Sequence, residues 1–349
     1  MIIDVHHHYL PPRYFEEFDR LLPERIDAVR HYGRIAGHDR EAGYTTTPAI
    51  DPICWCDETL QLEAMDAAEV DHAVLSAACF QDWMTMDAAR IINEGTAHLV
   101  SRHPDRFSGM ISVPPDGGEE MVEEIRRARD LGLCAVNMTT THRGRYPDHK
   151  DFRLMLETAA NLKLPVYVHP SWRGPLQHME RWNLERSIGK PTDLNLGIAN
   201  LMFGGAFAEL PDLRMVFAHL GGSLPVTMRR LFFGQPGWLS APDYDYPTLL
   251  KRLFVDTAPG MWQSPLEIQC AAMILGVSQM LMGSDYPLSN DPAGVLKASV
   301  DHVRLTNLSD TEKERILATN AIEVFGLHHL DALSNKGGAQ QIHPAAGCC

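Results

Sequence analysis

Pro165-Val166-Tyr167-Val168-His169-Pro170 is a short run of β-branched and aromatic residues that ends on a histidine and is stopped by a proline. An apolar run of this length is typical of a buried strand in a parallel sheet. Because proline has no backbone N–H to donate, the strand should end there and leave His169 at its carboxyl end. The run therefore predicts a buried strand with a metal-competent side chain at its end.

Seven further runs of this kind occur along the chain, and segments with helical periodicity separate them. Strands that alternate with helices indicate βαβ units, and eight units match an α/β fold of the (β/α)8 TIM-barrel type in number and order. The expected strands are Ile2–His8, His72–Ala77, Phe107–Val113, Cys134–Met138, Pro165–His169, Arg214–His219, Leu253–Thr257 and Gln279–Ser284. The expected helices cover residues 57–69, 86–103, 118–131, 151–163, 197–209, 223–233, 264–276 and 291–303, with an extra C-terminal helix at 309–325.

An open doubly wound sheet is the alternative architecture, but its Gly-x-Gly-x-x-Gly turn after the first strand is missing. The barrel is therefore favoured, as a single domain over residues 1–330. The connection of residues 9–56 is too long for an ordinary loop and predicts an insertion that forms a lid or an oligomer contact. Residues 331–349 lack periodicity, and we expect a disordered tail there.

The composition is that of an ordinary globular chain, with 45% hydrophobic and 22% charged residues, so a large core can form. The formal net charge of −14 leaves no basic stripe for a nucleic acid or an anionic membrane, and a small-molecule substrate is the expected partner. The seven cysteines are an odd number without a repeated Cys-x-x-Cys spacing, which indicates reduced thiols. With no signal-like start and no long apolar run, we expect a soluble cytoplasmic protein.

Five side chains could form one site. His6 and His8 should share one face of the first strand, because side chains alternate along a strand. His169, His219 and Asp285 each follow a buried apolar run, and the carboxyl ends of barrel strands are where active sites assemble. Any one of these histidines alone would be read as a core residue, but their shared position predicts a site.

Imidazole nitrogens together with one carboxylate suit Zn²⁺ first, with Mn²⁺ and Fe²⁺ as alternatives. A catalytic ion keeps one position open for water or substrate. We therefore expect four ligands and one acid/base residue, His219. The expected ligands are His6, His8, His169 and Asp285.

The motifs around these residues resemble the amidohydrolase superfamily, and within it the branch of metal-dependent α-amino-β-carboxymuconate-ε-semialdehyde decarboxylases. The similarity extends from residue 2 to about 328. It rests on Ile3-Asp4-Val5-His6-His7-His8, Val168-His169-Pro170, Phe217-Ala218-His219-Leu220-Gly221-Gly222 and Gly283-Ser284-Asp285-Tyr286-Pro287. The resemblance implies the same four metal ligands, a proton-handling His219 and a homodimer.

The resemblance also places Arg230 where the branch keeps a substrate-binding arginine. A second arginine is missing between Gly43 and Trp55, and a third is missing from residues 233–238. An aromatic residue of the family pocket is replaced near Arg186. These departures predict a substrate that differs from the aminocarboxymuconate semialdehyde.

Two chemistries fit the predicted site. The first is non-oxidative decarboxylation of an aromatic or unsaturated carboxylic acid, in which His219 or Asp285 moves the proton and Arg230 or Arg186 pairs with a carboxylate. The second is hydrolysis of a lactone or amide by a metal-activated water. A metal-stabilised binding protein without turnover is the third interpretation. The aromatic residues expected to form an apolar pocket are Trp55, Phe80, Trp83, Trp172, Trp182 and Trp262.

Overall fold

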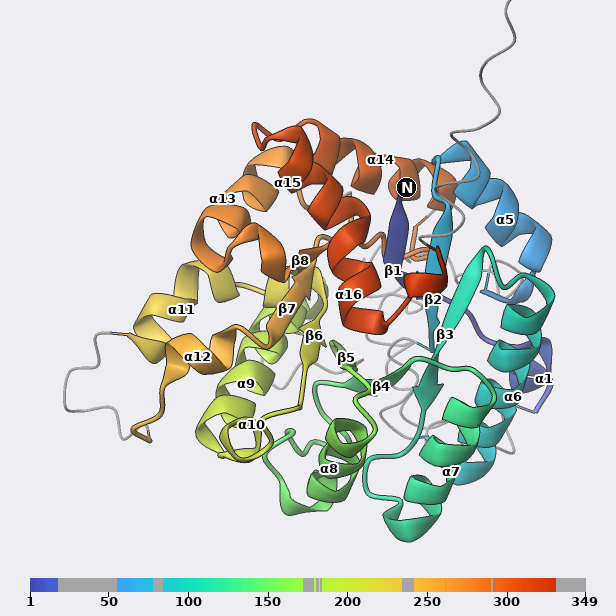
Figure 1. The fold of residues 1–349 in the computed structure, drawn as a ribbon, viewed down its shortest axis with the longest axis horizontal. Coiled ribbons are helices and arrows are strands. Elements are labelled where there is room, and N and C mark those ends of the chain that lie inside the picture. Colours follow the sequence, from blue (N-terminus) through green and yellow to red (C-terminus); the bar gives the residue numbers. More distant parts are fainter. Residues whose placement is uncertain are drawn as a thin grey trace, which may run out of the picture.

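The computed structural model contains one eight-stranded parallel sheet, whose strands neighbour one another in chain order (Figure 1). The residues described are 1–17, 55–77, 84–171, 179, 182, 184–233, 242–260, 262–289 and 291–330. The strands are β1 Ile3–His8, β2 His72–Ser76, β3 Phe107–Ser112, β4 Ala135–Thr139, β5 Val166–His169, β6 Met215–Phe217, β7 Leu253–Asp256 and β8 Met280–Leu281. All eight match the strands expected from the sequence, although most are shorter.

Backbone hydrogen bonds between β1 and the segment after β8 close the sheet into a barrel. The Val5 N–H donates to the Met282 carbonyl over 3.0 Å, and the His8 N–H donates to the Tyr286 carbonyl over 2.9 Å. In the opposite direction, the Asp285 N–H donates to the His6 carbonyl over 2.9 Å. The (β/α)8 prediction is thereby confirmed.

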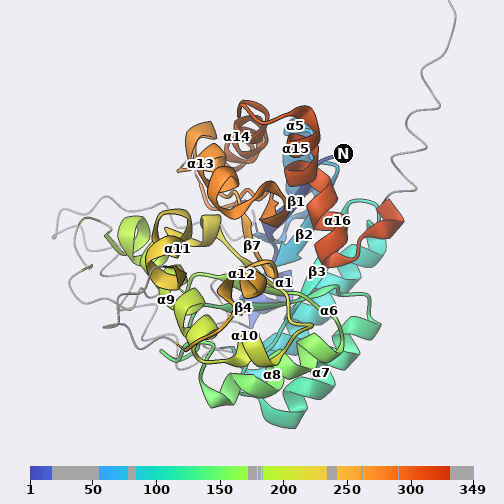
Figure 2. The same cartoon turned by 60° about the vertical axis from the view of Figure 1, so that its left-hand side comes forward.

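Helices surround the strands, and both views place them outside the sheet (Figures 1 and 2). Several begin at the residue that the sequence marks as a cap: the Asp57 carboxylate accepts from two backbone N–H groups, and Ser264 forms a capping box with Glu267. The helices are α1 Pro12–Glu16, α5 Glu58–Ala67, α6 Met86–Arg102, α7 Gly118–Asp130, α8 Arg153–Asn161, α9 Lys190–Phe203, α10 Ala206–Glu209, α11 Leu224–Phe232, α12 Tyr246–Leu250, α13 Pro265–Leu275, α14 Pro292–Arg304, α15 Asp310–Glu314 and α16 Asn320–Phe325.

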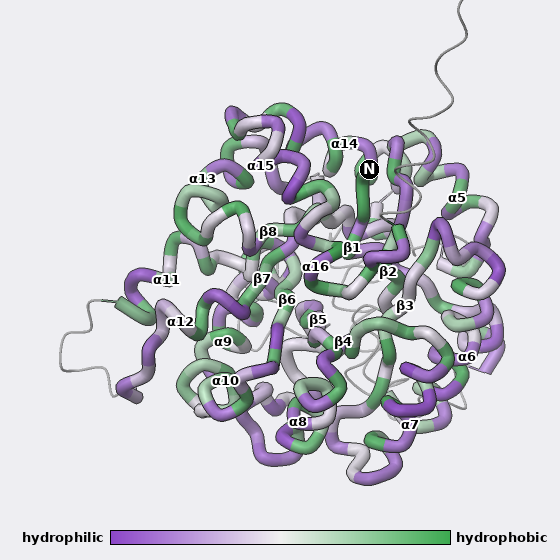
Figure 3. Tube along the Cα trace, viewed as in Figure 1, coloured by the Kyte–Doolittle hydropathy of each residue, from purple (hydrophilic) through white to green (hydrophobic). Residues whose placement is uncertain are grey.

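The main apolar core lies between the strands and the surrounding helices, and Figure 3 shows hydrophobic stretches on both. A second apolar cluster joins barrel residues such as Val74 and Tyr167 to Ala321 and Phe325 of α16. Because the Asn320 amide donates to the Met280 carbonyl at the start of β8, α16 covers the amino end of the barrel. The carboxyl end is left for the site.

The structure corrects three of the expected bounds. The helix expected at 197–209 is two helices, because α9 starts earlier and Gly205, with a φ of 83°, breaks the chain before α10. His219 lies outside its expected strand, because β6 ends at Phe217, and β8 ends at Leu281 and not at Ser284, so Asp285 does not directly follow the strand. Both residues lie in the turns that follow.

The insertion expected at residues 9–56 is described only in part. Its first residues form α1, and Trp55 lies at its far end, buried and 2% exposed. The lid predicted from this insertion and the tail of residues 331–349 lie outside the described residues, as do Phe80, Trp83 and Trp172. In the part of the chain that the structure describes, no helix is long and apolar enough to span a membrane.

Candidate metal centre

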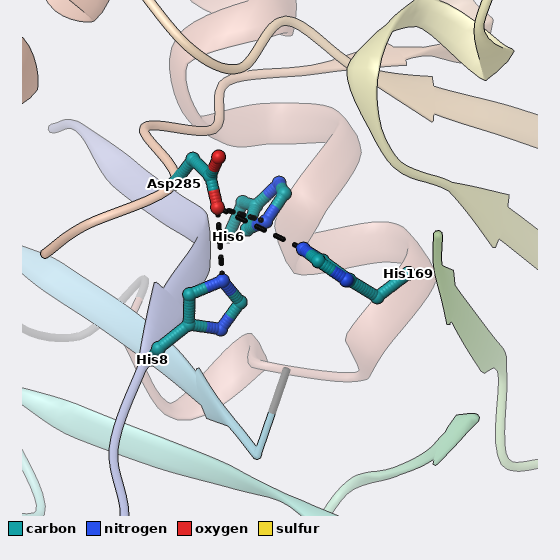
Figure 4. A group of neighbouring side chains, drawn as sticks. All are labelled: His6, His8, His169 and Asp285. Carbon is teal, nitrogen blue, oxygen red and sulfur yellow. Dashed lines mark hydrogen bonds and ion pairs between the residues drawn. The ribbon is translucent and has the colours of Figure 1, made fainter. Parts of the chain in front are cut away.

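His6, His8, His169 and Asp285 meet at the carboxyl end of the barrel (Figure 4). One oxygen of Asp285 lies 3.0 Å from the Nε2 atom of His8, 3.1 Å from that of His6 and 3.7 Å from that of His169. One donor atom from each of the four side chains lies within 4.8 Å of the others, and all four side chains are buried. The structure thus brings together the four ligands expected from the sequence, in a cluster that can hold a divalent metal ion.

Strand alternation positions the two histidines of β1 as expected. His6 and His8 both reach the cluster, whereas the His7 ring turns away, binds Asp4 over 3.0 Å and stacks on Tyr286. His169 ends β5, as its apolar run indicated. Three of the four side chains therefore reach the cluster directly from strands.

Asp285 and the neighbouring His219 reach the cluster from strained turns instead. Their φ angles are 64° and 53°, in a left-handed region that residues other than glycine seldom adopt. Backbone hydrogen bonds hold both turns: the Asp285 N–H donates to the His6 carbonyl, and the His219 N–H donates to the Asp256 carboxylate. Strain held in place by such contacts is common at functional sites.

The imidazole Nδ1 atoms face away from the cluster and have partners of their own. The Nδ1 of His6 binds the Asp256 carboxylate over 2.9 Å, and that of His169 binds the Pro170 carbonyl over 2.9 Å. Because both partners can only accept, each Nδ1 carries a proton, and Nε2 is the atom through which each ring would bind a metal ion. The Nδ1 of His8 binds the Ser76 hydroxyl over 2.8 Å. Apart from the nearby Asp285 oxygen, the Nε2 atoms of His6 and His169 have no partner, so the donor set fits a bound cation.

Burial and mutual interactions shift the pKa values of all four residues of the cluster. Although burial opposes its ionisation, the imidazoles of His6 and His169 keep the pKa of Asp285 well below its usual range. Burial lowers the pKa of His8 to about 4 and that of His169 to about 3, so both rings are neutral at pH 7. For His6, burial works against the charged form, but Asp256 and Asp285 raise its pKa to about 10.

His219 lies beside this cluster. Its ring centroid is 4.9 Å from that of His6 and 5.6 Å from that of His169. Its Nδ1 donates to the Ala258 carbonyl over 3.2 Å, whereas its Nε2 has no hydrogen-bond partner and is free to exchange a proton. Burial lowers the pKa of His219 to about 3, so the ring is a neutral base at pH 7.

Asp256 is a functional residue that the sequence interpretation missed. Its carboxylate is fully buried at the end of β7 and accepts hydrogen bonds from the His6 ring, the Tyr167 hydroxyl over 2.6 Å and the His219 N–H over 2.9 Å. These contacts connect the metal cluster to the expected proton carrier. The sequence did carry a signal for this residue, because Asp256 ends an apolar strand just as His169 does.

The expected substrate-binding residues lie in different surroundings. Trp182 is 70% exposed, Arg230 is exposed on α11, and Arg186 is partly buried in a π-helical turn just before α9. Trp55, by contrast, stacks on His8 with ring centroids 5.5 Å apart and an interplanar angle of 11°. Trp55 is therefore joined to the cluster through His8.

Comparison with known proteins gives consistent matches. The chain is 29% identical over 289 residues to the 2-amino-3-carboxymuconate-6-semialdehyde decarboxylase of Dictyostelium discoideum, covering 80% of this chain and 79% of that protein. It is 25% identical over 300 residues to the gamma-resorcylate decarboxylase of Rhodococcus jostii, covering 77% and 88%.

A solved structure shares the fold: a 5-carboxyvanillate decarboxylase of Novosphingobium aromaticivorans with bound manganese, at a TM-score of 0.75 and 21% identity over 93% of this chain and 97% of that one. The family model described as amidohydrolase matches residues 3–327, nearly the whole described barrel. With that match and the buried cluster at the carboxyl end of its barrel, the chain belongs to the amidohydrolase family.

Proposed function

We propose that this protein is a metal-dependent carboxy-lyase, a non-oxidative decarboxylase of an aromatic or unsaturated carboxylic acid. The observation that carries the proposal is His219, whose Nε2 has no hydrogen-bond partner and whose ring lies beside the buried four-residue cluster. The chain that holds this arrangement is similar over most of its length to proteins named as decarboxylases of such acids.

The proposed metal ligands are His6, His8, His169 and Asp285. Three imidazole nitrogens and one carboxylate oxygen favour Zn²⁺, and the manganese bound by a structurally similar decarboxylase supports Mn²⁺ as the alternative. A bound divalent ion would supply Lewis-acid polarisation of a substrate oxygen.

His219 is the proposed proton carrier. In decarboxylation the bond to the carboxyl carbon breaks, CO₂ leaves, and the carbon left behind must gain one proton. The Ala258 carbonyl keeps a proton on the Nδ1 of His219, so the Nε2 atom is the one that can take a proton and pass it on. Asp285, which is ionised and has one oxygen within 3.7 Å of three imidazole nitrogens, is the second group near the reacting atoms.

A planar substrate would suit the walls of the site. The Trp55 indole lies parallel to His8 and is almost fully buried, so it presents an apolar edge beside the cluster. We propose Arg230 and Arg186 as partners for a substrate carboxylate, and Trp182 as a further aromatic contact. Replacing each of these three residues separately would test its assignment.

We also propose a homodimer in the cytoplasm. Exposed apolar side chains on neighbouring helices support an interface: Val226 of α11 is 77% exposed, and Leu266 and Met273 of α13 are 67% and 79% exposed. The scattered cysteines support a reducing compartment.

Product analysis tests the proposed reaction. The purified protein, loaded separately with Zn²⁺ or Mn²⁺, is incubated with hydroxybenzoates, picolinate-like acids and lactones, and both CO₂ and ring-opened products are measured. We expect CO₂ and the protonated product in equal amounts from at least one acid. Ring opening without CO₂ would instead assign the site to hydrolysis, and no conversion with normal metal binding would indicate a binding protein.

A further inference from the structure

Asp193, in the first turn of α9, is a fully buried carboxylate outside the metal cluster. Hydroxyl and amide groups from two loops converge on it. Its Oδ1 accepts from the Tyr146 hydroxyl over 2.8 Å, and its Oδ2 accepts from the Thr140 hydroxyl. The same Oδ2 accepts from the Ser171 hydroxyl over 3.2 Å and from the Ser171 N–H over 3.3 Å. A buried carboxylate with this many donors is held firmly in one orientation.

The Ser171 contact matters because of what lies across the same peptide bond. The Ser171 N–H and the Pro170 carbonyl belong to one planar peptide group, so fixing one fixes the direction of the other. The Ser171 N–H also donates to the Thr140 hydroxyl over 2.9 Å. On the other side of the plane, the Pro170 carbonyl accepts from the Nδ1 of His169 over 2.9 Å. A chain of contacts therefore runs from Asp193 to the ring of a proposed metal ligand.

The turn that carries Asp193 is itself fixed in place. Asn195 lies two positions after Asp193, on the opposite side of α9. Its side-chain amide donates to the Ser223 hydroxyl over 2.9 Å. Gly222 packs so closely on this turn that a Cβ atom there would lie 2.2 Å from the Pro191 carbonyl oxygen. The start of α9 is thus held against the turn that follows His219, and Asp193 projects from a rigid support.

We propose that Asp193 is a positioning residue for the metal centre, which orients His169 through the Thr140 hydroxyl and the Pro170–Ser171 peptide. The inference rests on the proposed function, because it requires His169 to be a ligand. Partners of this kind, one layer outside the ligands, set ring orientation and metal affinity.

The test compares four variants by Zn²⁺ affinity and by the visible absorption spectrum of the Co²⁺-loaded protein, which reports ligand geometry. Asp193→Ala removes the acceptor of all these hydrogen bonds, and Thr140→Val replaces the bridging hydroxyl with a methyl group. Tyr146→Phe is the matched control, because it removes a hydrogen bond from the same carboxylate without touching the Ser171 peptide. Thr140→Ser restores the hydroxyl.

We expect Asp193→Ala and Thr140→Val to lower Zn²⁺ affinity by about tenfold or more and to change the Co²⁺ spectrum. Tyr146→Phe and Thr140→Ser should stay close to the unmodified protein in both measurements. If Asp193→Ala does not fold, the Thr140→Val and Thr140→Ser pair decides the question.

Two outcomes overturn the inference while leaving the proposed function intact. One is unchanged affinity and spectrum in Asp193→Ala and Thr140→Val. The other is an equal loss in Tyr146→Phe, which would indicate general loosening of the loop. If the unmodified protein itself binds neither Zn²⁺ nor Co²⁺, the proposed metal centre fails and this inference falls with it.

Discussion

Replacing Asp256 by asparagine should weaken metal binding by reversing the protonation of His6. The Oδ1 of Asp256 accepts from two backbone N–H groups, those of His219 and Ala258. Because neither N–H can accept, the amide oxygen of the new asparagine must take this position, and its N–H₂ group then faces the Nδ1 of His6. That nitrogen can accept only if its own proton moves to Nε2, the atom that the ion requires.

The expected loss in Zn²⁺ affinity is about 10- to 100-fold, or about 1.4 to 2.7 kcal/mol, the usual effect of removing the partner that sets a ligand's tautomer. Tyr167→Phe is the control. The Tyr167 hydroxyl donates to the same Oδ2 atom as His6, so its removal costs one hydrogen bond but leaves the carboxylate to hold the His6 proton. Tyr167→Phe should lower the free energy of unfolding by about 1 kcal/mol and leave the Zn²⁺ affinity unchanged.

Competition against a chelator of known affinity measures both variants, with thermal unfolding of the metal-free proteins to show that they are folded. Normal Zn²⁺ affinity in a folded Asp256→Asn protein would refute the tautomer argument. So would an equal loss of affinity in Tyr167→Phe, because the ring would then be oriented by packing alone.

Three further predictions follow from the same site and from one ion pair outside it. His219→Ala should lower the rate of CO₂ release by about 10²- to 10⁴-fold at unchanged metal content, since the residue moves protons and is not a proposed ligand; a metal-free variant would contradict this role. Chelation should abolish turnover and lower the melting temperature, and Zn²⁺ or Mn²⁺ should restore both, because an ion that binds only the folded state stabilises it. Burial opposes the charge of Asp116, but Arg145, 2.6 Å away, and His142 lower the pKa of its carboxyl group. These ion pairs therefore stabilise the folded protein at pH values above the ordinary carboxyl pKa, and this stabilisation is lost as the pH falls through the lowered pKa. Asp116→Asn should therefore cost about 1 kcal/mol in urea unfolding at pH 7 and progressively less below pH ~4, and a cost independent of pH would exclude the ion pair as its origin.

The sequence predicts most of this fold because its signals are local. Apolar runs such as Val166–His169 bound each strand, and helical periodicity separates them. The alternation of His6 and His8 is equally local, and both side chains lie where alternation places them. The break at Gly205 was missed, because residues 197–209 retain an apolar period across it.

Long-range contacts determine what the sequence could not show. His219 and Asp285 could be identified as site residues, but their left-handed turns depend on hydrogen bonds to Asp256 and His6. Asp193 carries no signal at all, since a helical aspartate is usually a solvated residue. Its significance comes from two loops that approach it only in the folded barrel.

The seam between β1 and the segment after β8 also sets an order of events during synthesis. His8 and Asp285 are in contact although 277 positions separate them in the sequence. The barrel therefore cannot close until its last segment has been synthesised. Until then β1, with its three histidines, is an unpaired sheet edge, the kind of edge on which chains aggregate. A nascent chain stalled before residue 285 therefore lacks both the seam and the fourth donor, and stable uptake of the ion would report that the last strand has docked.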